Sequence, residues 1–167
     1  MEPWSQSLEV GVPEMDEAHR SLDQQVTLAL DAVEKGNATV VATALTTVVA
    51  GLRPHFEWEE GKMAESAYRE APAHVAAHAA YLRELEGVAA EFPAAGLSPR
   101  FRLWFGSRLA PWLRLHIRGL DAQFARHYRA WQEKQAKVAE AALIAEAKVA
   151  APSAEAAAPG ATGKKGH

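Results

Sequence analysis

The chain has 167 residues, 49% of them hydrophobic, which is the length of one ordinary domain with enough apolar surface to build its own core. Its 18 basic and 21 acidic side chains leave a formal net charge of −3. Nothing in this balance favours the basic surface that nucleic-acid binders need, so we expect no nucleic-acid partner. The absence of cysteine excludes disulfides, iron–sulfur clusters and thiolate ligands, so any metal must be bound through nitrogen and oxygen.

The sequence shows neither a targeting signal nor a membrane span. Residues 1–5 carry no basic flank and no apolar stretch, and no later segment is apolar for long enough to cross a bilayer. We therefore expect a soluble, cytoplasmic protein without membrane insertion. We also expect a monomer.

The first elements in the chain are an irregular arm and a helix. The arm, residues 1–12, has the scattered apolar anchors Trp4, Leu8, Val10 and Val12. A helix is predicted over about 13–35, with Pro13 in its first turn and Gly36 directly after its end. Its apolar residues recur at three- and four-residue spacing, and His19 lies on their stripe.

A second helix is predicted over about 39–66, although its propensity is poor. Its β-branched residues, together with Gly51 and Pro54, would also suit a strand. Yet His55, Glu59 and Met63 share one helical face, so we expect one helix that is kinked near Pro54.

Two further helices complete the predicted fold. The third runs from Pro72 to just before Pro93, and the fourth begins at a capping Ser98 followed by Pro99. The histidines on their inner faces are His74, His78 and His116. Four amphipathic helices joined by short loops predict an all-α, up-down-up-down four-helix bundle over residues 1–131.

The composition changes after residue 131 to alanine, glutamate and lysine. This predicts a C-terminal helical extension over residues 132–150 with a thin apolar stripe, followed by a disordered tail over 151–167. Two interpretations of residues 132–167 remain: a solvated appendage, or a segment that binds a protein partner.

Histidines on the core faces are the feature that indicates chemistry. One histidine on an apolar face is usually a hydrogen-bonded group and not a metal ligand. Here each of the four helices carries at least one, and burying five unpaired imidazoles would cost about 1–3 kcal/mol each. A shared metal would remove this cost by occupying one ring nitrogen of each. The five histidines are His19, His55, His74, His78 and His116.

The spacing of these residues strengthens the metal hypothesis. Residues four apart project from one helix face and can bind the same ion, as in the pairs His55 and Glu59, and His74 and His78. Asp121 follows His116 by five residues, which places it about 140° around an ideal helix. A π-type widening near Gly119 is therefore predicted, so that both side chains face the core.

The set of donors favours two iron ions. Imidazole and carboxylate suit iron, and carboxylates can bridge two ions, whereas a structural zinc site closes at four ligands and leaves three of the seven unexplained. Ferritin-like di-iron proteins use Glu-x-x-His pairs, and no such pair occurs here.

The segments around these residues resemble those of a known family, the bacterial hemerythrins. The resemblance covers about residues 4–131. The resemblance rests on Trp4 and on four segments: LEVGVPEMDEAHR at 8–20, HFEWEEGKM at 55–63, HVAAH at 74–78 and WLRLHIRGLD at 112–121.

The resemblance implies a non-haem di-iron centre that binds dioxygen reversibly. One iron would be held by His74, His78 and His116, and the other by His19 and His55, with Glu59 and Asp121 as bridges. An oxo or hydroxo group would form a third bridge, and the second iron would keep an open position for oxygen.

Apolar residues flank the ligands at helical spacing, namely Phe56, Met63, Trp112, Leu113 and Ile117. By resemblance, the last three lie near an oxygen pocket. Plain core packing explains all five equally well, and we expect both roles at once.

Three basic residues near or beyond the ligands are expected to have no part in metal binding. We expect Arg114 and Arg118 to be solvated, although one of them could pair with Glu17 or another acid near the bundle end. His127 is expected to be a surface histidine.

The function expected from this pattern is reversible oxygen binding for carriage, storage or buffering, without catalytic turnover. A di-iron enzyme or a sensor acting on peroxide, nitric oxide or oxygen is the alternative. The sequence supplies no acid and base pair beside an open substrate pocket, which makes an enzyme the weaker hypothesis.

Overall fold

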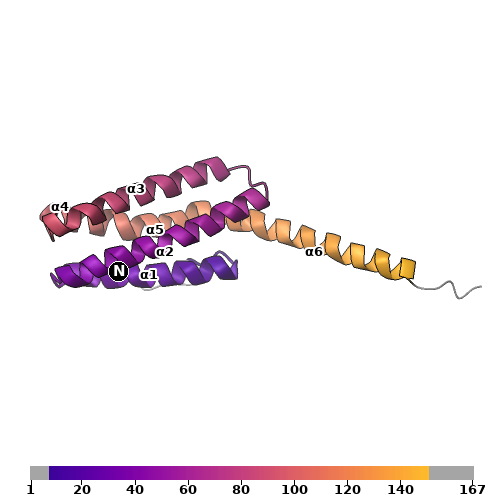
Figure 1. Cartoon of the computed structure of the whole chain (residues 1–167), viewed down its shortest axis with the longest axis horizontal. Coiled ribbons are helices and arrows are strands. Elements are labelled where there is room, and N and C mark those ends of the chain that lie inside the picture. Colours follow the sequence, from indigo (N-terminus) through magenta and orange to yellow (C-terminus); the bar gives the residue numbers. More distant parts are fainter. Residues whose placement is uncertain (1–7, 151–167) are drawn as a thin grey trace, which may run out of the picture. The chain divides into compact units, whose positions relative to one another are not determined.

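The structure is a computed structural model that describes residues 8–150, and within that range the chain forms helices and no strand. The helices are α1 (Pro13–Glu34), α2 (Ala38–Glu65), α3 (Ala71–Ala95) and a fourth, interrupted helix composed of α4 (Pro99–Trp104), α5 (Ala110–His116) and α6 (Ala122–Ala150). In the first 131 residues these helices lie side by side (Figure 1). Short loops reverse the chain between them, so the predicted up-down-up-down four-helix bundle is confirmed.

Local sequence signals set the helix boundaries. The Asn37 side chain accepts a hydrogen bond from the Val40 N–H at the start of α2, over 3.1 Å. Ser98 accepts one from the Phe101 N–H at the start of α4, over 3.2 Å. Gly36 has a φ of 71°, a left-handed conformation that glycine adopts without strain, and it lies just after the end of α1.

Two prolines lie inside helices. Pro54 is within α2, which is one helix as predicted, while the kink near Pro54 stays a prediction. Pro93 is within α3, so the predicted end of this helix before Pro93 is wrong. Pro93 lacks one backbone N–H, but the helix continues past it and ends at Gly96, whose N–H donates to the Phe92 carbonyl over 2.8 Å.

The core of the bundle is formed by apolar side chains from all four helices and from the end of the arm, where Leu8, Val10 and Val12 are buried. The core also encloses nine polar or charged residues among those described: His19, Asp23, His55, Glu59, Ser66, His74, His78, His116 and Asp121. Such a concentration of buried polar groups in a small bundle requires partners for them.

The chain divides into two compact units, Met1–Trp131 and Gln132–His167. In the second unit, the described residues continue α6, and every side chain from 132 to 149 is exposed. The exposed residues include Val138, Leu143, Ile144 and Val149. A protein partner for this extension stays a prediction. Trp4 and the predicted disordered tail, 151–167, lie outside the described residues.

None of the helices in residues 8–150 is both long and apolar enough to cross a membrane.

Candidate metal centre

The seven predicted ligand residues all lie together in the core of the bundle, and all are buried. All four helices of the bundle contribute to the cluster, the fourth being the interrupted one. The residues are His19 from α1, His55 and Glu59 from α2, His74 and His78 from α3, His116 from α5, and Asp121 from the segment that follows α5. The structure thus brings together every residue that the sequence indicated.

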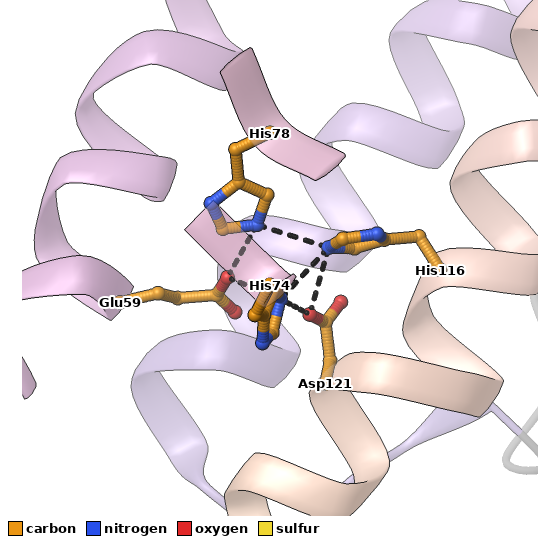
Figure 2. A group of neighbouring side chains, drawn as sticks. All are labelled: Glu59, His74, His78, His116 and Asp121. Carbon is orange, nitrogen blue, oxygen red and sulfur yellow. Dashed lines mark hydrogen bonds and ion pairs between the residues drawn. The ribbon is translucent and has the colours of Figure 1, made fainter. Parts of the chain in front are cut away.

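The cluster consists of two overlapping groups. The five-residue group contains Glu59, His74, His78, His116 and Asp121 (Figure 2). The four-residue group contains His19, His55, Glu59 and Asp121. Within each group, one ligand atom of every residue lies within 4.8 Å of the others. The two carboxylates, Glu59 and Asp121, belong to both groups.

Three imidazoles converge in the five-residue group. The Nε2 atom of His116 is 2.9 Å from Nε2 of His74 and 2.9 Å from Nε2 of His78 (Figure 2). Neighbouring ligands of one octahedral ion, with bonds of about 2.1 Å, would be about 3.0 Å apart. Both distances from His116 therefore match the spacing of adjacent coordination positions on one ion.

The Glu59 carboxylate presents one oxygen to each group. Its Oε1 atom faces His19 and His55, at 3.8 and 3.5 Å from their Nε2 atoms. Its Oε2 atom faces His74 and His78, at 3.8 and 3.2 Å. This is the arrangement that a carboxylate bridging two ions requires.

Asp121 repeats this arrangement from the other side of the bundle. Its Oδ2 atom is 3.2 Å from Nε2 of His19. Its Oδ1 atom is 2.9 Å from Nε2 of His74 and 3.1 Å from that of His116. Two carboxylates therefore connect the same two positions.

A π-helical segment, Ile117–Asp121, places Asp121 on the same side as His116. The wider π turn brings residues five apart into register, which an α-helix does not do. The predicted widening near Gly119 is confirmed. A second π-helical segment, Phe105–Leu109, was not predicted.

Two of the histidines are held in the protonation state that metal binding needs. Burial, helped by the neighbouring His19, lowers the pKa of His55 to about 3. Burial, helped by His116, lowers the pKa of His78 to about 2. Both imidazoles are therefore neutral at pH 7, with a ring nitrogen free to bind a metal.

The two carboxylates differ in their electrostatic surroundings. Burial and the nearby charge of Asp121 raise the pKa of Glu59. Burial also acts to raise the pKa of Asp121, but the ring nitrogens around it outweigh this effect and its pKa lies well below the usual range. Two carboxylates this close repel each other when both are ionised, and a cation between them relieves the repulsion.

Many polar atoms of the cluster make no hydrogen bond, although several lie within ion-pair distance of one another. These atoms are both ring nitrogens of His19, Nε2 of His55, Nδ1 of His74 and the carboxylate oxygens of Glu59 and Asp121. Each unsatisfied buried group costs about 1–3 kcal/mol. A metal ion would satisfy those that face the centre, and the donors are of the nitrogen and oxygen types that transition metals accept. The buried cluster can therefore hold a metal ion.

Glu60 supports the cluster from outside. Its Oε1 atom is 3.1 Å from Nδ1 of His78. A proton on Nδ1 that is donated to this carboxylate leaves the Nε2 lone pair directed at the five-residue group. The spacing of residues along the chain shows no sign of this contact, because Glu60 and His78 lie on different helices.

Aromatic rings pack against the five-residue group. Phe56 stacks on His78, with ring centroids 3.7 Å apart and an interplanar angle of 5°. Trp112 stacks on His116 at 4.4 Å and 17°, and Tyr81 stacks on Trp112 at 3.6 Å and 3°. These contacts restrict the rotation of the two imidazoles.

The five predicted pocket residues all lie in or beside the core. Phe56, Met63, Leu113 and Ile117 are buried, whereas Trp112 is half-buried. Their packing role follows from this burial. Their part in an oxygen pocket stays a prediction.

Two of the basic residues have partners within the bundle. Arg114 agrees with the alternative that one of the two arginines pairs with an acid, because its Nε atom is 2.8 Å from Oδ1 of the buried Asp23. His127 is half-buried and donates from Nε2 to the Ser66 carbonyl at the end of α2, over 2.9 Å. Arg118 is exposed. Both partners are more than 60 residues away in sequence, at separations of 91 and 61, so no local pattern indicated them.

Comparison with known proteins gives one informative relationship. No protein-family profile matches the sequence. A bacteriohemerythrin of Pseudomonas paraeruginosa is 25% identical to the chain over 122 residues, which span 72% of this chain and 77% of that relative. The resemblance to the bacterial hemerythrins is confirmed. It agrees with the buried cluster of histidine, glutamate and aspartate that the bundle encloses.

Proposed function

We propose that the chain binds dioxygen reversibly at a non-haem di-iron centre formed by the two groups. The observation that carries the proposal is the placement of Glu59 and Asp121. In each carboxylate, one oxygen faces the five-residue group and the other faces the four-residue group. Similarity to a bacteriohemerythrin supports the same function.

The donors support two iron ions in preference to one zinc ion. A structural zinc site closes with four ligands, often cysteines, whereas this cluster offers five imidazoles and two carboxylates. Imidazole and carboxylate together suit iron, and an oxo or hydroxo group would complete the bridge between the two ions.

The unequal groups support binding of a small ligand at one position. The five-residue group nearly fills an octahedral ion, whereas the four-residue group leaves room for a further ligand beside His19 and His55. When bound, a pair of ferrous ions supplies dioxygen with an open coordination position and two electrons.

The apolar residues around both groups would keep the centre dry. Leu113, Ile117 and Met63 are buried, and Phe56 covers one face of His78. Exclusion of water protects a reactive centre from side reactions such as loss of the bound ligand by protonation. Carriage, storage or buffering of oxygen needs this protection and needs no group for acid and base catalysis.

Anaerobic reconstitution with ferrous iron tests the proposal. We expect two irons per chain and an absorption band that appears when air is admitted and disappears when oxygen is removed. Glu59→Gln should lose the band, and Glu57→Gln, a change at an exposed residue of the same helix, should keep it. Rapid, irreversible oxidation to a diferric form would favour the enzyme, and failure to bind iron would refute both functions.

A further inference from the structure

A buried ion pair lies one helical turn from His19. Asp23 in α1 and Arg114 in α5 form two parallel hydrogen bonds, with Nε 2.8 Å from Oδ1 and Nη2 3.1 Å from Oδ2. The side chains are 3% and 16% exposed, respectively, so the pair is shielded from water and from the screening that weakens surface ion pairs.

Stability alone is a poor reason for this pair. Taking a carboxylate and a guanidinium out of water costs several kcal/mol per ion, and well-packed apolar residues in their place are often as stable or more so. An apolar contact, however, tolerates sliding, whereas a two-point contact between planar groups fixes both distance and direction. The pair therefore offers α1 and α5 a defined alignment.

The position of the pair relates this alignment to the metal centre. Asp23 follows His19 by four residues on the same face of α1, a rise of about 6 Å. Arg114 precedes His116 by two residues in α5. His19 is the ligand that α1 contributes, and it belongs to the four-residue group only. A shift of α1 along α5 would therefore move His19 away from Asp121, and it would leave the five-residue group in place.

We propose that Asp23 and Arg114 are positioning residues that set the metal affinity of the four-residue group by holding His19 in place. They act through α1 and α5 and do not touch the metal. This inference rests on the proposed two-metal centre. Supporting groups of this kind typically change metal affinity about 10- to 100-fold.

The test is an anaerobic titration of the apoprotein with ferrous iron, with the dissociation constant of each step measured by calorimetry. We assign the tighter step to the five-residue group, which has more ligands, and the weaker step to the four-residue group. In the double variant Asp23→Leu/Arg114→Met, we expect the weaker step to lose about 10- to 100-fold in affinity and the tighter step to be unchanged. The control is Glu84→Gln, which breaks the ion pair with Arg108 on the exposed surface. It should change neither step.

The titration distinguishes the failure of this inference from the failure of the proposed function. A wild-type protein that binds fewer than two irons contradicts the two-metal centre itself. Two irons with unchanged constants in the double variant overturn the positioning role alone. Equal weakening of both steps also overturns it, because a general loss of structure would act on both groups.

Two single variants keep the inference testable if the double variant does not fold. Arg114→Lys retains the charge but loses the two-point contact, and Asp23→Asn retains the shape but loses the charge. Each single variant should lower the iron affinity of the weaker step only, and by less than the double variant does. Wild-type binding in both single variants overturns the inference.

Discussion

The two groups of the candidate centre are supported in different ways. In the five-residue group, aromatic rings stack on His78 and His116, and Glu60 contacts His78 from behind. In the four-residue group, neither ring nitrogen of His19 has a hydrogen-bond partner. The buried side chain of Asp23, which pairs with Arg114, lies one turn further along α1.

This difference shows how a bundle can build a stable position and an open position side by side. Ligands held by direct contacts define a rigid coordination sphere. A ligand held mainly by the packing of its helix leaves space around the metal. The location of that ligand then depends on how the helix packs. We therefore expect the five-residue group to bind iron more tightly than the four-residue group.

Removing a shared carboxylate should have the largest effect, because it acts on both groups at once. Asp121→Asn keeps the shape of the side chain but removes the charge that the surrounding imidazoles face. We expect metal binding to be lost at both positions, with less than one iron per chain by elemental analysis. Two irons bound with wild-type affinity would show that Asp121 does not bridge.

Removing one histidine from the four-residue group should empty that group alone. His55→Ala leaves the three imidazoles of the five-residue group intact. We expect one iron per chain in place of two, and no oxygen-dependent absorption. Loss of both irons would mean that the groups do not bind independently.

Changing the support of a ligand should have a smaller effect than removing a ligand. Glu60→Gln weakens the acceptor for His78 Nδ1, so iron in the five-residue group should bind about 10-fold more weakly in competition with a chelator. Glu57→Gln, at an exposed position three residues earlier, is the matched control and should bind iron normally. Equal iron affinities in the two variants would show that Glu60 does not support His78 as a ligand.

The smallest effect on metal binding is expected from the pocket residue Leu113. Leu113→Ala should leave iron content unchanged but accelerate oxidation to the diferric form several-fold, because water gains access to the centre. Leu109→Ala is the control, since Leu109 is equally buried one turn earlier in the same interrupted helix. Each truncation costs about 2–5 kcal/mol of stability, so the rates are compared at a temperature where both variants are folded. Equal oxidation rates would place Leu113 outside the pocket.

Most ligands of the centre could be predicted because the spacing of residues along a helix shows which of them share a face. His55 with Glu59 and His74 with His78 are four residues apart, so an amphipathic pattern alone places each pair on one face. Asp121 required a departure from the α-helix, and the five-residue separation from His116 indicated where the departure had to be.

The features that escaped prediction depend on contacts distant in sequence. Asp23 and Arg114 are 91 residues apart, and their pairing follows from how α1 packs on α5. No ligand spacing marks the π-helical segment Phe105–Leu109, so nothing in the sequence required a widened turn there. The end of α3 was missed for a local reason, because the helix passes Pro93 and ends three residues later, at Gly96.

The most direct test of the central claim is anomalous scattering at the iron absorption edge from crystals of the iron-loaded protein. The account predicts two iron peaks per chain, about 3.5–4 Å apart. One peak should lie among His74, His78 and His116, and the other beside His19 and His55, with Glu59 and Asp121 between them. A single peak, or peaks outside these two groups, would contradict the account.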